Sequence, residues 1–142
     1  LLPGFVTEDF AAPDQGYGGA TIRFSRKGSG PPLLLLHGNP MTHVAWHKLA
    51  PKLAEKFTIV AADLRGYGDS IGPEDAGEGS RNYTFRAMAL DMVALMASLG
   101  FLRFQVAGHD RGARTTHRMA LDRPDRVLRA AVVDILPNVH IW

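Results

Sequence analysis

The chain has 142 residues, of which 46% are hydrophobic and 21% charged, with a formal net charge of +2 and no cysteine. This length and composition fit one globular domain and leave no room for two complete domains. The lack of cysteine excludes disulfides, a thiolate zinc site and a thiol nucleophile, and it is typical of a cytoplasmic protein. The small, dispersed charge does not indicate a nucleic-acid partner.

The first half of the chain alternates short strands with turns and one helix. Alternating apolar and polar residues predict an edge or half-buried strand over Ala20–Ser25. Aliphatic runs predict buried strands over Leu33–His37 and Thr58–Asp63. A helical segment over Val44–Lys56 should bend or restart at Pro51, because proline has no backbone N–H to donate. The aliphatic run that begins at Leu33 is far shorter than the ~18 residues of a membrane span, and the first residues lack a basic region followed by an apolar one. We therefore expect no membrane span, no secretory signal and no membrane partner.

The second half continues the alternation of strands and helices. Residues 64–82 are rich in Gly, Asp, Glu and Ser and predict a long surface loop with a functional edge near Arg65. The remaining predicted elements are a helix over Thr84–Leu99 with a possible cap near Asn82, a strand over Phe104–Gly108, a helix over Gly112–Leu121 and a strand over Val127–Val133. Strands separated by helices predict an α/β fold with a mostly parallel sheet and helices on both faces.

Small residues surround an aspartate between a predicted strand and a predicted helix, in the segment Gly108–Ala113. The pattern is typical of a nucleophile elbow, where side chains on either side of the nucleophile would clash with the backbone. Asp110 stands at the tip, where the helix N-terminus favours its ionised form. A carboxylate there can attack saturated carbon and form an ester that water later cleaves. The alternative is that Asp110 serves only as an N-cap.

Two arginines follow the elbow at a spacing of three, which places Arg111 and Arg114 on one helix face. Their position near the helix N-terminus is unfavourable for a cation. We therefore expect them to bind the carboxylate of a small anionic substrate and to hold its neighbouring carbon over Asp110. The alternative is a surface pair that contacts Asp122, Asp125 or other acids, and Arg118 is expected to be structural.

Two further candidates follow predicted strands. The backbone N–H groups of Asn39 and Arg111 would form an oxyanion hole, although Gly-Asn-Pro also suits a tight turn. Asp134 ends a strand at the carboxyl edge of the sheet, where it could orient a catalytic histidine, or it could simply begin a turn before Pro137.

Four segments together resemble the α/β-hydrolase fold and, more narrowly, the fluoroacetate and haloacetate dehalogenases. They are Leu33–Gly38, Ala62–Ser70, Gly108–Arg114 and Val133–Pro137. The resemblance implies that Asp110 displaces halide, that Arg111 and Arg114 bind the substrate carboxylate, and that Asp134 supports the catalytic histidine. It also implies that water, activated by that histidine, cleaves the ester to release glycolate, and that no metal or organic cofactor takes part.

The sequence departs from this family in two ways. Asn39 replaces an aromatic residue and is similar to the asparagine that helps to hold halide in haloalkane dehalogenases. Those enzymes and epoxide hydrolases tend to have Trp after the nucleophile, whereas this chain has Arg111, and their neutral substrates would give two arginines nothing to bind. Epoxide hydrolase, haloalkane dehalogenase and a non-catalytic, ligand- or partner-binding fragment remain the alternatives.

The second departure is that no histidine matches the position of the family's catalytic base, and His140 and Trp142 do not match its cap motif. We therefore expect residues 1–142 to be the N-terminal part of one core domain, without the cap and the last strands. The expected partners are a small anionic halogenated substrate and the C-terminal half of the same protein, and a homodimer is a further possibility.

Overall fold

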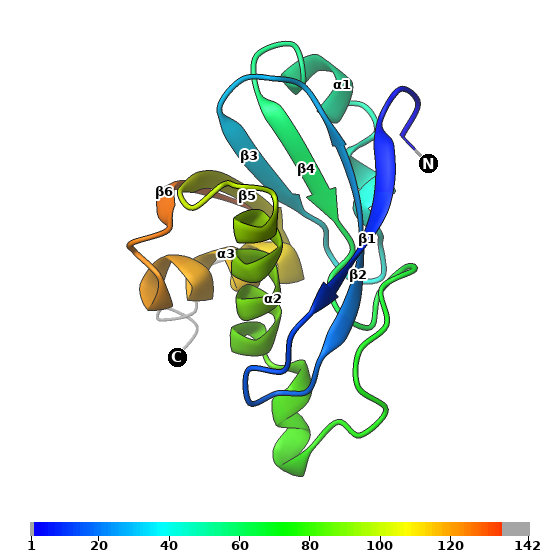
Figure 1. Ribbon diagram of the computed structural model, residues 1–142, viewed down its shortest axis with the longest axis vertical. Coiled ribbons are helices and arrows are strands. Elements are labelled where there is room, and N and C mark those ends of the chain that lie inside the picture. The colour runs from blue at the N-terminus through cyan, green and yellow to red at the C-terminus, as the bar shows by residue number, and fades with distance from the viewer. Residues whose placement is uncertain (1, 135–142) are drawn as a thin grey trace.

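The computed structural model describes residues 2–134, whose strands form a single six-stranded sheet. The strands are β1 (Val6–Ala12), β2 (Ala20–Lys27), β3 (Pro32–Leu36), β4 (Thr58–Ala62), β5 (Phe104–His109) and β6 (Val127–Val133). They lie in the order β1-β2-β4-β3-β5-β6 (Figure 1). β1 and β2 pair in antiparallel fashion with their neighbours, whereas β4, β3, β5 and β6 run parallel. The expected mostly parallel sheet is confirmed.

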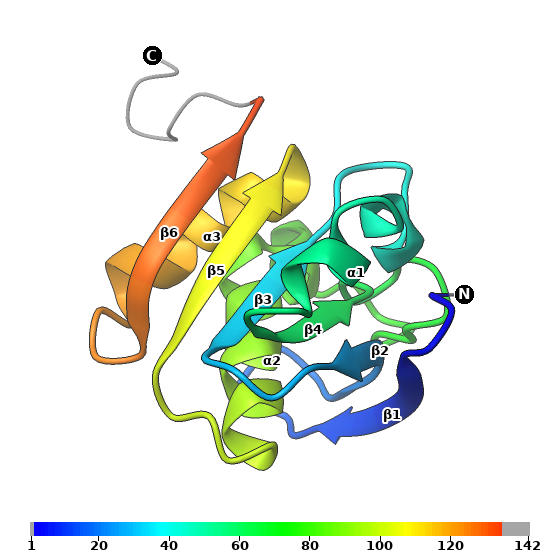
Figure 2. The same cartoon turned by 90° about the horizontal axis from the view of Figure 1, so that it is seen from above.

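Helices cover both faces of this sheet (Figure 2). They are the 3-10 helices η1 (His43–Trp46) and η2 (Glu78–Tyr83) and the α-helices α1 (Ala50–Leu53), α2 (Phe85–Ser98) and α3 (Arg111–Asp122). α1 lies over one face, and α2 and α3 lie over the other. No helix within residues 2–134 has the length and apolar character needed to cross a bilayer.

β3 shows how the sheet forms a hydrophobic core on each face. Successive side chains of a strand point to opposite faces. Leu34 and Leu36 therefore pack in the cluster that contains Met92 of α2, whereas Leu35 packs in the cluster that contains Ala50 of α1. Because both faces are covered, every position of the strand favours an apolar residue, which explains the unbroken run of leucines.

The restart expected at Pro51 is present: the segment over residues 44–56 is divided into η1 and α1, with Pro51 in the first turn of α1, where its missing N–H costs no helical hydrogen bond. Two other local expectations differ from the structure. α2 is capped by Thr84, whose Oγ1 accepts from the Ala87 N–H at 3.2 Å, and not by Asn82. The loop after β4 contains η2, whose backbone departs from helical angles at Gly79 and Ser80.

β1 is a strand that the sequence did not predict. Because it contains polar residues, among them Glu8 and Asp9, the segment lacks the apolar pattern of a buried strand. It is an edge strand that pairs along its whole length with β2. Arg23 and Arg26 of β2 bind the carboxylates of Asp9 and Glu8 across the strand pair. Charged residues are well tolerated on such an edge, because they do not have to be buried.

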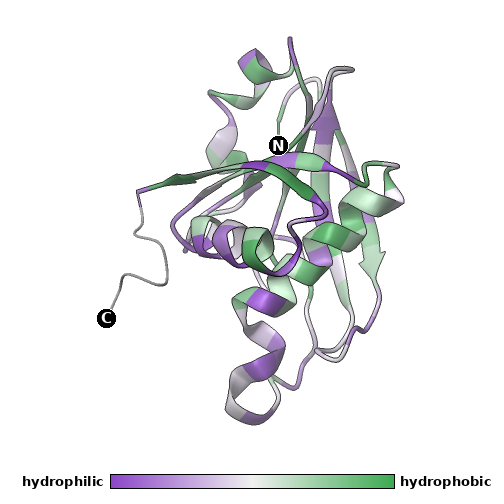
Figure 3. Ribbon diagram, turned by 90° about the vertical axis from the view of Figure 1, so that its left-hand side faces the viewer, coloured by the Kyte–Doolittle hydropathy of each residue, from purple (hydrophilic) through white to green (hydrophobic). Residues whose placement is uncertain are grey.

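β6 forms the opposite edge and exposes hydrophobic side chains, including Leu128, Val132 and Val133. Figure 3 shows this strand as a hydrophobic ribbon at the margin of the molecule. A mostly apolar groove of about 500 Å³ lies beside it on the α1 side, lined in part by Trp46 and Ala131. Within residues 2–134, β6 pairs only with β5, so its outer backbone groups are unpaired.

Candidate active site

Asp110 lies at a sharp turn between the end of β5 and the start of α3. Its backbone angles, φ 54° and ψ −115°, belong to a region that non-glycine residues rarely adopt. Glycines on both sides make the turn possible: a Cβ on Gly108 would overlap the Gly112 carbonyl, and a Cβ on Gly112 would overlap the Leu36 carbonyl. The elbow geometry expected from the small residues is present, and it carries a carboxylate at its tip.

The Asp110 carboxylate is held by backbone N–H groups. The N–H of Asn39 donates to Asp110 Oδ2 at 3.0 Å, so the loop after β3 contacts the elbow directly. This hydrogen bond, supported by one from the Arg111 N–H, keeps the pKa of Asp110 below its ordinary value. Asp110 is half-buried and therefore accessible in its ionised form. The structure brings together Asp110 and the two N–H groups that the sequence grouped with it.

Arg111 and Arg114 occupy the first turn of α3, where Arg111 is exposed and Arg114 is partly buried. Of the acids that offered an alternative explanation for this pair, the two named ones bind other arginines. Asp122 contacts Arg86 and Arg118, and Asp125 contacts Arg123 and Arg126. Arg118, at 2.7 Å from Asp122 four residues on, has the structural contact expected of it.

Asp134 directly follows β6 and lies at the same end of the sheet as the elbow. β6 pairs with β5 so that Val133 is opposite His109, and the Asp110 N–H approaches the Val133 carbonyl at 3.4 Å. The exposed carboxylate of Asp134 is 3.7 Å from His109 Nε2. No role was expected for His109, because only the pairing of β5 with β6 brings its imidazole to Asp134.

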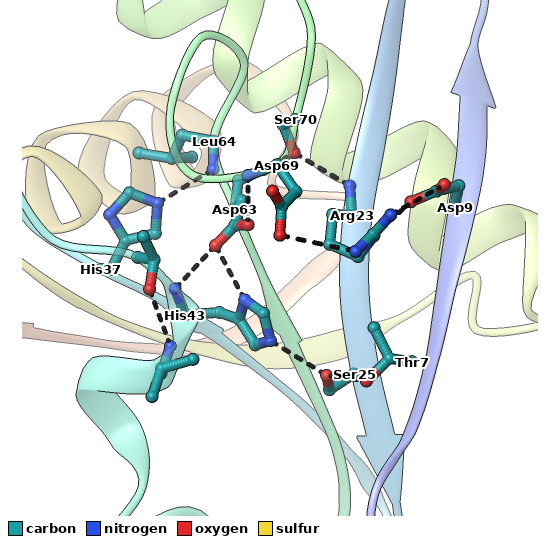
Figure 4. A network of polar contacts seen from close by, with 12 residues as sticks. Thr7, Asp9, Arg23, Ser25, His37, His43, Asp63, Leu64, Asp69 and Ser70 are labelled. Atoms are coloured by element: carbon teal, nitrogen blue, oxygen red, sulfur yellow. Dashed lines mark hydrogen bonds and ion pairs between the residues drawn. The ribbon is translucent and has the colours of Figure 1, made fainter. Parts of the chain in front are cut away.

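His37 fixes the backbone that precedes Asn39 (Figure 4). Its Nε2 accepts from the Leu64 N–H at 3.0 Å, so its Nδ1 carries the proton and donates to the Gly38 carbonyl at 2.9 Å. Burial lowers the pKa of His37, which keeps the ring neutral in this arrangement. The loop that presents the Asn39 N–H is thus tied to the loop after β4.

Asp63 and His43 form a second tie between the same two loops, visible in Figure 4. Asp63 Oδ1 accepts from the backbone N–H and from Nδ1 of His43, at 2.7 and 2.8 Å, and Oδ2 accepts from the Asp69 N–H at 3.0 Å. Although burial opposes it, these hydrogen bonds lower the pKa of Asp63. The carboxylate therefore stays ionised beneath the site.

Ser25 extends this network, because its Oγ lies 2.9 Å from His43 Nε2. Ser25, His43 and Asp63 have the connectivity of a hydrolase triad, but all three are buried in the core. A substrate has no access to Ser25 Oγ there. The cluster is a structural support, and the sequence signal for it was weak because its members come from three separate segments.

The functional edge expected near Arg65 is not present. Arg65 is buried, and its guanidinium donates to both carboxylate oxygens of Asp91, at 2.6 and 2.7 Å. It also donates to the carbonyls of Tyr17, Gly18 and Asn82. Arg65 therefore fastens the loop after β4 to α2 and to the β1–β2 hairpin, and none of its charge faces a substrate.

Within residues 2–134 there is no cluster of three or more His, Asp or Glu side chains that could hold a metal ion.

Sequence comparison places these residues among known hydrolases. The profile of the alpha/beta hydrolase fold matches residues 31–142. A fluoroacetate dehalogenase of Burkholderia sp. is 57% identical over 121 residues, which cover 85% of this chain and 40% of that enzyme. A soluble epoxide hydrolase of Corynebacterium sp. strain C12 is 38% identical over the same length and with the same coverage of the two chains.

Structure comparison agrees with this placement. A crystal structure of a protein from Nostoc sp. PCC 7120 superposes with a TM-score of 0.90 and 49% identity, over 96% of this chain and 45% of that one. An epoxide hydrolase from an endophytic Streptomyces superposes with a TM-score of 0.81 and 31% identity, over 92% of this chain and 37% of that one. The chain thus spans less than half the length of these relatives. It belongs to the alpha/beta hydrolase fold family, in the branch that includes epoxide hydrolases and dehalogenases.

Proposed function

We propose that the full-length protein hydrolyses haloacetate, either fluoroacetate or chloroacetate, to glycolate and halide through a covalent ester on Asp110. The observation that carries this proposal is the ionised Asp110 carboxylate at the elbow, followed on α3 by Arg111 and Arg114. A carboxylate nucleophile suits an electrophilic carbon, and the adjacent guanidiniums suit a substrate that is itself an anion. The similarity to a fluoroacetate dehalogenase supports the same assignment.

In the first step, Asp110 Oδ1 attacks the α-carbon of the haloacetate. Because the Asn39 N–H holds Oδ2, Oδ1 is the oxygen that is available for attack. A new C–O bond forms while the C–halogen bond breaks, and its electron pair leaves with the halide. Arg111 and Arg114 would hold the substrate carboxylate, which aligns the carbon and offsets the repulsion between two anions.

In the second step, water attacks Cγ of the resulting ester. Negative charge then develops on Oδ2, which the Asn39 N–H already faces, so this donor stabilises the tetrahedral intermediate without rearrangement. The Arg111 N–H, which also hydrogen-bonds the Asp110 carboxylate, would be the second donor. Collapse of the intermediate returns the Asp110 carboxylate and releases glycolate. A histidine oriented by Asp134 would remove the proton from the water, and we propose that this histidine comes from the part of the protein beyond the described residues.

The exposed β6 edge and the apolar groove beside it support this view of the whole protein. We propose that the C-terminal half of the same protein adds further strands beyond β6 and covers the groove. Residues 1–142 would then be the N-terminal part of one core domain, and the cap that encloses the halide would come from outside them. The expectations for His140 and Trp142 fall outside the described residues.

The test is halide release from fluoroacetate and chloroacetate by the full-length protein. Asp110→Asn should abolish it because it removes the nucleophile. Arg111→Ala should abolish it because it removes one of the two arginines that we propose bind the substrate carboxylate. Arg123→Gln is a matched control, since Arg123 binds Asp125 away from the elbow. In ¹⁸O-labelled water, a single turnover should place the label in Asp110. Full halide release by Asp110→Asn, or label in glycolate alone after one turnover, would overturn the proposal.

Epoxide hydrolysis is the second candidate, favoured by the similarity to epoxide hydrolases. The same carboxylate would open a neutral epoxide, and the product would be a diol. A full-length protein that forms diols and leaves haloacetate unchanged would establish this activity in place of dehalogenation, and halide release from a haloalkane would indicate the corresponding dehalogenase. If none of these substrates alkylates Asp110, detected as a mass increase, the chain acts as a binding module.

A further inference from the structure

A second group of arginines surrounds a surface cavity away from the elbow. The cavity has a volume of about 460 Å³ and lies between the start of α2, the middle of α3, η2 and the β1–β2 hairpin. Its lining consists of Tyr17, Arg81, Thr84, Phe85, Arg86 and Arg118. Three of these six residues are cationic, although the chain as a whole has a net charge of only +2.

The carboxylate of Asp122 balances only part of this positive charge. It contacts Arg86 Nε at 3.1 Å and an Arg118 terminal nitrogen at 2.7 Å, so one acid serves two arginines. The Arg81 guanidinium lies over the Tyr17 ring, 4.9 Å from its centroid. The cavity therefore has an excess of two positive charges at its wall.

One donor in this wall has no partner. Arg118 Nε is buried and makes no hydrogen bond within the part of the chain that the structure describes. Leaving a buried donor of a charged group unsatisfied is costly. A guanidinium has its five N–H groups in a fixed plane and commonly binds the two oxygens of a carboxylate or phosphate. The side chain as a whole is 32% exposed, so a small rotation would present this N–H to an oxyanion in the cavity.

The placement of Arg86 also indicates an anion. Arg86 lies in the first turn of α2, a helix of 14 residues whose N-cap is Thr84. The positive end of the helix dipole disfavours a cation there and favours an anion. Asp122 already pairs with Arg86, so a bound oxyanion would mainly compensate the helix dipole.

We propose that this cavity is a second anion site, which takes a small carboxylate or phosphate ion. The helical rise places Arg118 about 10 Å along α3 from Arg111, so one small ion cannot occupy both places. The second site therefore does not depend on the proposed reaction at Asp110. It gives the three cavity arginines a common ligand, bound by charge and by the free Arg118 N–H.

The test uses the full-length protein with Asp110→Asn, so that no turnover occurs. Glycolate and inorganic phosphate are titrated separately while the Arg118 Nε–H resonance is followed by NMR. This resonance should shift saturably with at least one of the two ions, and Arg111→Ala should leave the shift in place. The ion that produces it distinguishes a carboxylate site from a phosphate site. No saturable shift with either ion would overturn the proposal.

Variants separate this site from a general effect of charge. In calorimetric titrations, which do not need the Arg118 resonance, Arg118→Gln and Arg81→Gln should each weaken binding by about tenfold, because each removes a charged contact to the ion. Arg81 is exposed, so its variant should fold even if Arg118→Gln does not. Arg123→Gln removes the same charge at the Asp125 pair and should change the affinity less than twofold. Equal weakening by Arg81→Gln and Arg123→Gln would show that only the overall charge matters and would refute the site.

Discussion

Gly38→Ala tests whether the Asn39 N–H supports the Asp110 carboxylate. A Cβ on Gly38 would lie 2.7 Å from Asp110 Cβ and 3.2 Å from its Oδ2. Non-bonded carbons prefer separations of about 3.5–4.0 Å, so the loop or the elbow must move by roughly 1 Å. The Asn39 N–H to Oδ2 distance, now 3.0 Å, would then lengthen to about 4 Å, beyond hydrogen-bonding range.

The loss of this donor should appear in both the rate and its pH dependence. Removing one oxyanion donor typically lowers kcat by about 10²–10³-fold, and we expect a decrease of about 100-fold in halide release by the full-length protein. Because the Asn39 hydrogen bond lowers the pKa of Asp110, its loss should move the acid limb of the pH–rate profile to higher pH. The overpacked contact should also cost about 1–3 kcal/mol of the free energy of unfolding.

Gly79→Ala serves as the control for a loss of stability without a change at the site. A Cβ there meets no atom within 4 Å, but the positive φ of 63° strains an alanine. This variant should unfold more easily and keep both its kcat and its acid limb. If Gly38→Ala retains halide release within threefold of the parent, the contact between Asn39 and Asp110 does not support catalysis and the reasoning fails.

Three further predictions concern the substrate clamp and the buried polar groups. Arg111→Lys keeps the positive charge but loses the paired N–H donors of the guanidinium, so KM for haloacetate should rise about tenfold. Arg123→Gln should leave KM unchanged. Equal changes of KM in the two variants would exclude binding of the substrate carboxylate by Arg111. Burial lowers the pKa of His37, so the free energy of unfolding should fall as the pH drops below about 6.5, where the unfolded chain takes up a proton and the folded chain does not. Urea unfolding of His37→Gln should show a smaller decrease over this pH range. A pH dependence equal to that of the parent would contradict the prediction. Asp91→Asn leaves Arg65 buried without its carboxylate and should cost about 3–5 kcal/mol in urea unfolding, and a loss below 1 kcal/mol would be inconsistent with a buried pair.

The predictable features of this chain are those with a local signal. The aliphatic runs of β3 and β4, the periodicity of α2 and the small residues around Asp110 each lie within one short segment, and all are present in the structure. β1 could not be predicted from such a local signal, because this strand is stabilised by pairing with β2 and not by burial of its polar side chains. The positions of Asp110 and the Asn39 N–H followed only because the elbow pattern implies a fixed relation between β3 and β5.

Contacts between distant segments had no such signal. Arg65 was expected to be functional because it lies in a polar loop, yet it is buried and paired with Asp91, which is 26 residues away in the sequence. In the sequence, Asp91 is only a single polar residue in an otherwise apolar helix, so it does not indicate this pair. His109 contacts Asp134 only because β5 and β6 are neighbours in the sheet. A single sequence shows that a residue is charged, but the partner that decides its role is set by the tertiary fold.

The buried network explains how a strained elbow can hold the Asp110 carboxylate in a fixed position. Asp110 adopts a backbone conformation that costs of order 1–3 kcal/mol, which persists only where the surroundings determine it. One side of these surroundings is the loop after β3, and His37 and His43 tie that loop to the segment after β4 through Leu64 and Asp63. Each tie uses a buried, hydrogen-bonded group, so the Asn39 N–H cannot drift from Asp110 without leaving a polar atom unpaired. The core thereby fixes the geometry that the proposed reaction requires before a substrate arrives.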